Sequence, residues 1–213
     1  MEHADETVLK ARRQMEERER ERHSDKVVEE ELKQSIYDQQ VFIFHIPVCF
    51  KEMEVLEGRA MMRLPEDFSP RSAEEIARVY FFGNKPQYVY TNQYLDFALA
   101  LNWTTHEVSD AGIFEFSKYI KYMIDRVGPK SKIMSEEQVK SAEGNMVILR
   151  LLSNALDGVN HTTIFFASVE KRLLLGSIAF DQKLSKRLIP LTDEIVKSFR
   201  VKREEDRDGN NNP

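Results

Sequence analysis

The chain has 213 residues, with 31 Lys and Arg against 36 Asp and Glu, and this length is one that a single domain can fill. Residues 1–40 carry 8 basic and 12 acidic residues and residues 202–213 carry 3 and 4, so the net charge of −5 lies outside a neutral segment 41–201. A neutral domain without a basic stripe lacks the electrostatic footprint of nucleic-acid binding, and we expect neither DNA nor RNA as a partner.

Residues 1–40 are predicted to form a charged helical arm that is largely solvated. The segment is rich in helix formers, and opposite charges such as Glu16 and Arg20 stand four residues apart. Arg22 and Asp25 fall where a coiled coil needs apolar residues. Apolar residues recur only at its end, at Val28, Leu32 and Ile36. This end can dock on the domain or on a partner, and a homodimer through the arm stays open.

The first dense apolar run is VFIFHIPVCF, at residues 41–50. Ten residues are too few to span a bilayer, and the run follows a highly charged segment of 40 residues instead of the short basic region of a signal peptide. The single cysteine, Cys49, excludes an intramolecular disulfide and fits a reducing compartment. We therefore expect a cytoplasmic protein without membrane insertion, with Cys49 as a buried small hydrophobe and not a nucleophile.

Two kinds of element follow in residues 53–104. Residues 53–64 suggest one or two short strands around Gly58, and Ser72 with Glu75 forms a capping box that predicts a helix over 73–81. The stretch KPQYVYTNQYLDFALALNWT then alternates with period two, which predicts a strand at Tyr88 and Tyr90, a tight connection at 92–93, and a strand over 95–103. Its odd-numbered members, from Leu95 to Trp103, are expected to face a core.

The second half of the domain predicts a helix, a meander and a final helix. Residues 111–127 have an apolar stripe of helical period, with Ser109 or Asp110 as the cap and Gly128-Pro129 as the end. Four strands follow within residues 131–181, joined by turns that are short enough only for antiparallel neighbours. A last helix is expected over 190–199. The predicted fold class is α+β, an antiparallel sheet of about six strands packed by helices, with a disordered tail at 202–213.

Motifs for the common chemistries are absent from the sequence. The eight glycines are scattered, so no Gly-rich loop can hold a phosphate, and no CxxC, HxH or HExxH spacing occurs. The segment THEVSD, with His106, Glu107 and Asp110, is interpreted as a polar loop and helix cap, and His161 as an edge or turn histidine. We therefore expect no catalytic residue, no metal and no cofactor.

The order of the motifs resembles the PsbP/DcrB-like superfamily. The similarity rests on LPEDF, the Ser-capped helix, KPQYVYTN, FALALNWT, the helix that ends in VG, the turn EGN and the closing IVKSFRV, over residues 60–201. It implies an αβα sandwich around an antiparallel sheet. That superfamily includes a Ran-binding nuclear-transport factor and adaptor chaperones of type VI secretion effectors, and its members mostly bind proteins.

The leading functional hypothesis is a cytoplasmic, non-enzymatic protein-binding module, an adaptor or chaperone for an apolar or amphipathic segment of another protein. The small residues Ala98 and Ala100 on one sheet face leave room for such a segment, although the helix over 111–127 is the favoured occupant. Two alternatives stay open: a scaffold that acts through its arm, and an enzyme that uses His106, Glu107 or His161. The candidate partner-binding residues are Tyr88, Tyr90, Ala98, Ala100, Asn102, Val28, Leu32 and Ile36.

Overall fold

A computed structural model describes residues 33–80, 85–92, 95, 97–127, 131–141, 144–155 and 158–202. Its centre is a seven-stranded sheet in the order β5-β6-β7-β11-β10-β9-β8, in which every neighbouring pair is antiparallel. The arm before residue 33 and the tail after residue 202 lie outside the described residues. The strands are β5 (Ser69–Pro70), β6 (Tyr88–Thr91), β7 (Ala98–Glu107), β8 (Ser131–Ser141), β9 (Gly144–Ala155), β10 (Gly158–Val169) and β11 (Arg172–Asp181).

The predicted meander of four strands, β8 to β11, is confirmed, and the sheet gains a seventh strand from the two-residue β5. The strand that was expected from Leu95 begins at Ala98, so its connection from β6 is longer than predicted. The alternation itself holds, because Leu95, Phe97, Leu99 and Leu101 are all buried. The bulky side chains of this stretch therefore serve the core.

Two smaller sheets complete the strands. One has the order β12-β4-β3, with β3 at Phe50–Val55, β4 at Ala60–Pro65 and β12 at Arg200–Val201, so the predicted strands around Gly58 are confirmed. The other is a hairpin of β1 (Val41–Ile43) and β2 (Ile46–Val48), which pairs with neither larger sheet.

Three α-helices lie in the described part of the chain: α2 (Ala73–Val79), α3 (Ile113–Val127) and α4 (Ser185–Lys197), the last preceded by a 3-10 turn, η1 (Gln182–Leu184). The capping box of α2 is present, since the Ser72 hydroxyl accepts from Glu75 N and the Glu75 carboxylate accepts from Ser72 N. Helix α4 begins five residues before the predicted start. Pro190, which was interpreted as its first residue, lies inside it instead.

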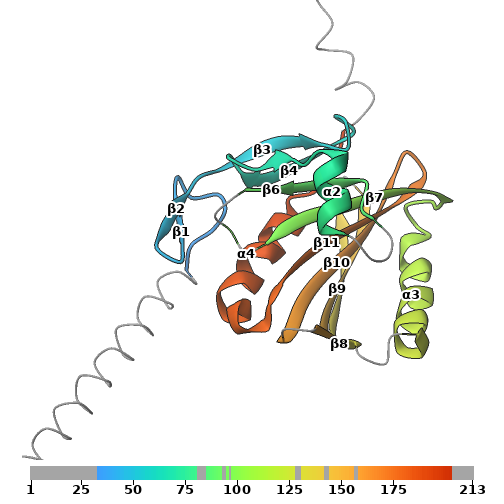
Figure 1. The fold of residues 1–213 in the computed structure, drawn as a ribbon. Coiled ribbons are helices and arrows are strands. Elements are labelled where there is room, and N and C mark those ends of the chain that lie inside the picture. The colour runs from blue at the N-terminus through green and yellow to red at the C-terminus, as the bar shows by residue number, and fades with distance from the viewer. Residues whose placement is uncertain are drawn as a thin grey trace, which may run out of the picture.

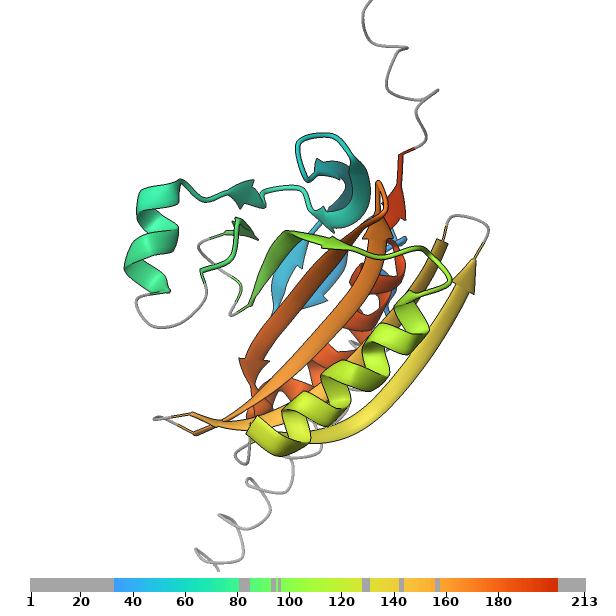
Figure 2. The same cartoon turned by 90° about the vertical axis from the view of Figure 1, so that its right-hand side faces the viewer.

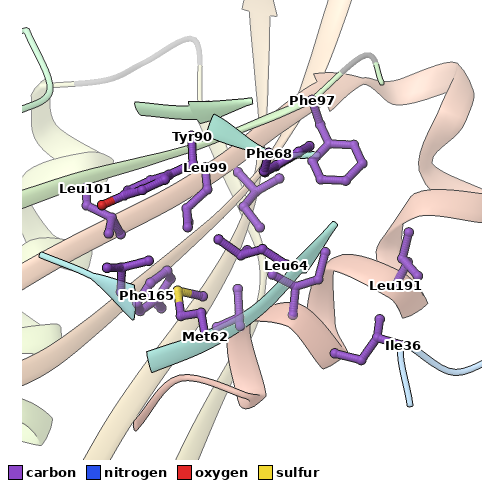
Figure 3. Packing of buried hydrophobic residues seen from close by; sticks show 14 of the residues in the cluster. Ile36, Met62, Leu64, Phe68, Tyr90, Phe97, Leu99, Leu101, Phe165 and Leu191 are labelled. Atoms are coloured by element: carbon purple, nitrogen blue, oxygen red, sulfur yellow. The ribbon is translucent and has the colours of Figure 1, made fainter. Parts of the chain in front are cut away.

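The elements form three layers. Helices α2 and α3 cover one face of the large sheet, and α4 with the three-stranded sheet covers the other, as Figures 1 and 2 show. The main core lies between the large sheet and the second of these layers, where Met62, Leu64 and Phe165 are fully buried (Figure 3). Ile36, which the sequence assigned to the arm, is also fully buried in this core.

The helix that covers Ala98 and Ala100 differs from the expected one. Both alanines pack with Ile76 of α2 and with Tyr80 at its C-cap, whereas α3 packs on a separate cluster formed by β9, β10 and β11. The expectation that the helix over 111–127 fills this part of the face is therefore wrong. The reason is lateral position: β7 lies two strands away from β10, and α3 lies over β8, β9 and β10.

Candidate protein-binding surface

The β1–β2 hairpin is closed by a two-residue turn that lacks the usual turn residues, Asn and Gly. Phe44 and His45 both have left-handed backbone angles, with φ of 50° and 66°, where Asn-Gly is the usual choice. Such a conformation costs an ordinary residue about 1–2 kcal/mol. The Phe44 ring offsets part of this cost, because it packs against the main core and lies 5.3 Å from the guanidinium carbon of Arg187.

The hairpin buries three apolar side chains and leaves three others exposed. Phe42 and its partner Pro47 lie on one face, whereas Ile46, the partner of Ile43, lies on the other face beside the turn. Val41, Ile43 and Val48 are buried, while Phe42 is 47% exposed and Ile46 is 37% exposed. Pro47, the cross-strand partner of Phe42, is exposed too. We call Phe42, Ile46 and Pro47 the hairpin patch.

A small depression with a volume of about 20 Å³ adjoins the hairpin patch, between β1 and the first turns of α4. Its lining is apolar apart from one amide and one guanidinium. The lining residues are Gln34, Val41, Phe42, Ile43, Arg187, Leu188, Pro190 and Leu191.

Both outer edges of the hairpin are closed to strand pairing in this structure. A two-residue turn makes Ile43 and Ile46 a hydrogen-bonded pair, so the backbone groups of Phe42 point away from β2. The Gln34 side chain forms hydrogen bonds with both backbone groups of Phe42: it accepts from Phe42 N at 2.5 Å and donates to Phe42 O at 3.4 Å. On the other edge Pro47 has no N–H to offer.

The structure places the sequence-predicted residues mostly inside the domain. Tyr90 is 6% exposed and Ala100 is covered by α2, whereas Ala98 is half-buried. Tyr88 is half-buried and donates its hydroxyl to Glu57 at 2.9 Å. Asn102 accepts from Gln87 N at 3.1 Å, which extends the β6–β7 ladder by one side chain.

Of the three residues predicted at the end of the arm, Val28 and Leu32 lie outside the described residues. Ile36 docks on the domain: its N–H donates to Glu194 of α4 at 2.8 Å, and its carbonyl accepts from Arg63 of β4 at 2.6 Å. These bonds tie the start of the described chain to α4 and β4.

A second group of exposed apolar residues lies on α3 and β8, at Tyr119, Tyr122 and Met134. The hydroxyl of Tyr122 accepts a hydrogen bond from Arg126. An exposed tyrosine carries a polar hydroxyl, which makes its exposure less costly than that of a purely apolar side chain. Met134 has no hydroxyl and is 51% exposed. The side chains of Phe42 and Ile46 have no polar group.

The residues proposed for a catalytic alternative do not converge. His106 and Glu107 are exposed at the end of β7, and Glu107 stands opposite Arg172 at the start of β11. His161 pairs with Phe180 at the other end of β11, about 25 Å away along the strand. Asp110 accepts from Asn145 N at 2.6 Å. No three metal-binding side chains cluster among the residues that the structure describes.

Two expectations for single residues need correction. His161 is not an edge or turn residue: it lies within β10, is 4% exposed, and stacks on Phe180 with ring centroids 5.0 Å apart. Cys49 is half-buried instead of buried, because it stands between β2 and β3 and joins neither strand. None of the helices in the described ranges is long and apolar enough to cross a membrane.

Sequence reasoning missed the hairpin patch, although a signal was present. VFIFHIPVCF alternates on either side of Phe44-His45, and Pro47 is typical of an edge strand. The turn contains neither Gly nor Asn, so the usual sign of a hairpin is missing.

No family model matches this sequence, and no curated protein resembles it. Among solved structures, cyanobacterial PsbP (CyanoP) from Synechocystis sp. PCC 6803 is similar with a TM-score of 0.53 and 12% identity, over 72% of this chain and 92% of that chain. The Ran-binding protein Mog1p of Saccharomyces cerevisiae gives a TM-score of 0.44 at 15% identity, over 72% and 96%. The type VI secretion immunity protein TplEi of Pseudomonas aeruginosa gives 0.39 at 10%, over 84% and 82%. The likeness to CyanoP, together with the three layers, shows that the chain has the PsbP-like α+β fold that its order of elements predicts.

Proposed function

We propose that this protein is a non-enzymatic binding module that holds an apolar or amphipathic segment of another protein, as an adaptor or chaperone does, at the hairpin patch. The observation that carries the proposal is the exposure of Phe42 and Ile46 on a hairpin that belongs to neither larger sheet. The adjoining depression is small, and its lining is mostly apolar.

The physical argument is the cost of leaving these side chains in water. Burying the exposed part of a Phe and an Ile contributes about 25 cal/mol for each Å² removed from water. The small sheet-face residues that the sequence singled out are less suited, since α2 already covers Ala98 and Ala100. The binding surface is therefore proposed at the hairpin and not at Tyr88, Tyr90 or Asn102.

The test compares two double variants of the full-length protein. Phe42→Ser with Ile46→Ser removes two of the three apolar side chains of the hairpin patch, and Tyr119→Ser with Tyr122→Ser removes two exposed side chains from α3. A partner captured with the wild-type protein is purified, and its affinity for each variant is measured by calorimetry. We expect a loss of about 2–4 kcal/mol in the hairpin variant, because buried aromatic and aliphatic anchors dominate such interfaces.

The α3 variant is expected to bind within about 0.5 kcal/mol of the wild type, since its side chains lie outside the proposed surface. Equal affinity of the hairpin variant and the wild type would exclude the hairpin patch as the binding surface. A captured partner that the protein converts chemically would exclude a purely binding role.

A further inference from the structure

A cluster of one tryptophan and two arginines lies where β7 is close to the β3–β4 turn and the β10–β11 turn. Trp103, the only tryptophan in the sequence, is half-buried, and two guanidinium groups lie over its ring. The guanidinium carbons of Arg172 and Arg59 are 3.8 Å and 4.5 Å from the ring centroid. We call these three residues the tryptophan–arginine cluster. They are far apart in the sequence, and the pairing of β7 with β11 and the packing of β3 and β4 bring them together.

Hydrogen bonds fix the geometry of the cluster before any ligand arrives. Trp103 donates its Nε1–H to Val169 O at 3.1 Å. Arg172 donates its Nε–H to Thr104 O at 2.8 Å, and a terminal nitrogen donates to Trp103 O at 3.4 Å. A guanidinium that is already stacked and bonded loses little conformational freedom on binding an anion.

The two arginines differ in how their charges are balanced. Arg59 pairs with Glu57 at 2.9 Å and with Glu170 at 3.5 Å. Arg172 forms no ion pair with any carboxylate in the described part of the chain, although Glu107 stands opposite it in the β7–β11 ladder. One positive charge beside Trp103 is therefore left without an acidic partner.

The two turns that border the cluster have unusual backbones. Leu56 and Glu57 have φ of 53° and 55°, and Glu170 and Lys171 have φ of 52° and 60°. This left-handed region is costly for residues other than Gly, and such residues concentrate at functional sites. Here the turns hold Glu57 and Glu170 against Arg59, which leaves Arg172 as the cation that a ligand can meet.

We propose that the tryptophan–arginine cluster binds a carboxylate, the Asp or Glu side chain of an acidic segment in a partner protein. The Nε–H of Arg172 bonds to a backbone carbonyl, and Nη2 bonds weakly to another, so its terminal nitrogens are the groups that can meet a carboxylate. Trp and Arg are the residue types that contribute most to interface energy. A phosphate carries nearly two negative charges, whereas a carboxylate carries one. The carboxylates of Glu57 and Glu170 therefore repel a phosphate more strongly than they repel the carboxylate of a partner. This site is separate from the hairpin patch, and it stands whether or not that patch binds a partner.

The test uses the fluorescence of Trp103 in the full-length protein, which reports on the site directly because no other tryptophan is present. The probe is an acetylated and amidated tetraglutamate peptide, and the corresponding tetraglutamine peptide is the neutral control. We expect a saturable change in emission with the glutamate peptide only, at constant ionic strength. Arg172→Gln should weaken the binding about tenfold or more, and Arg172→Lys less, because Lys keeps the charge without the fork.

Arg200→Gln is the matched control, because Arg200 pairs with Glu52 at 2.7 Å on the three-stranded sheet and does not touch Trp103. It should bind the peptide as the wild type does, and so should the hairpin variant. An equal response to tetraglutamine, or equal affinity in Arg172→Gln, would overturn the proposal. Inorganic phosphate that binds as tightly as the peptide would overturn the carboxylate assignment. Urea unfolding shows whether each variant is folded. If Arg172→Gln does not fold, the affinity of Arg172→Lys for the tetraglutamate peptide is the test, and an affinity equal to that of the wild type overturns the proposal.

Discussion

At the scale of single residues, His161 is the clearest case of a titratable group inside the core. Its Nδ1 atom is buried without a hydrogen-bond partner, and the nearby Thr163 hydroxyl is in the same situation. Burial lowers the pKa of His161 below its ordinary value of 6.5; Asp193 of α4 raises it in part, and Arg150 of β9 lowers it further. The histidine is therefore neutral in the folded protein at pH 7.

This lowered pKa predicts a loss of stability in acid. Below pH 6.5 the unfolded chain binds a proton at His161 that the folded chain still excludes, so the free energy of unfolding falls as the pH falls toward the folded pKa. His161→Phe keeps a ring against Phe180 and removes the titration. Urea unfolding at pH 7.5 and pH 5 should show a smaller loss for the variant than for the wild type. An identical loss in both proteins would show that His161 does not contribute.

Gly176 is required by the ring that lies across from it. Phe165 is its cross-strand partner and is fully buried, and a Cβ on Gly176 would stand 2.1 Å from two atoms of the ring. We expect Gly176→Ala to lower the free energy of unfolding by about 2 kcal/mol, as overpacking of a core does. Ser177→Ala, on the opposite face of the same strand, should cost about 0.5 kcal/mol or less. Combining Gly176→Ala with Phe165→Leu should cost less than the sum of the two single changes.

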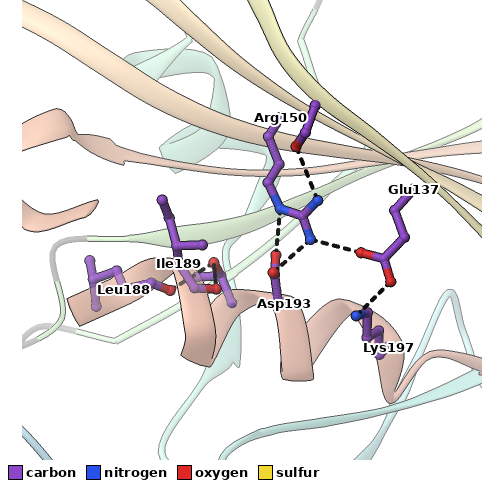
Figure 4. A network of polar contacts seen from close by, with 8 residues as sticks. Glu137, Arg150, Leu188, Ile189, Asp193 and Lys197 are labelled. Carbon is purple, nitrogen blue, oxygen red and sulfur yellow. Dashed lines mark hydrogen bonds and ion pairs between the residues drawn. The ribbon is translucent and has the colours of Figure 1, made fainter. Parts of the chain in front are cut away.

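At the scale of elements, α4 is tied to the sheet by one arginine as well as by its apolar face. Arg150 of β9 donates two hydrogen bonds to Asp193, at 2.9 Å and 2.6 Å, and one to Glu137 of β8 at 3.0 Å (Figure 4). Lys197 of α4 bonds to the same Glu137 at 2.6 Å, and this bond is the largest cause of the lowered pKa of Glu137. The network thus joins two strands to one helix through half-buried charges.

Arg150→Met should lower the free energy of unfolding by about 2 kcal/mol. The change removes four hydrogen bonds, three of them to carboxylates and one to the Ser135 hydroxyl, and leaves Asp193 without its cation. The loss stays below the 3–5 kcal/mol typical of fully buried pairs, because water reaches both carboxylates in part. Lys118→Ala, which breaks the exposed pair with Glu115, is the control and should cost about 0.5 kcal/mol or less. Equal losses in the two variants would mean that the network does not hold α4 in place.

At the scale of the whole molecule, local patterns in the sequence predict the main sheet well. Period-two alternation places β7 to β11, and the capping box at Ser72 places α2, because both signals depend on neighbouring residues. The position of α3 over the sheet could not be predicted in this way. It depends on which strand lies beside which, and β7 and β11 are joined across more than 60 residues of sequence.

The candidate sites were harder to predict than the sheet, for the same physical reason. The hairpin patch depends on a turn of Phe44 and His45 whose backbone contradicts the preferences of both residues. The tryptophan–arginine cluster joins positions 59, 103 and 172, and nothing near Trp103 in the sequence indicates either arginine. Tyr88 was singled out for its place on a strand face, and it reaches the edge of this cluster only through Glu57.

The measurement that tests the proposed role most directly is photocrosslinking in cells that express the full chain. A photoreactive phenylalanine analogue replaces Phe42 in one protein and Tyr119 in another, since both side chains are exposed. We predict a crosslink to one discrete partner protein from position 42 and none from position 119. Crosslinks to that partner from position 119 alone would contradict a binding surface at the hairpin.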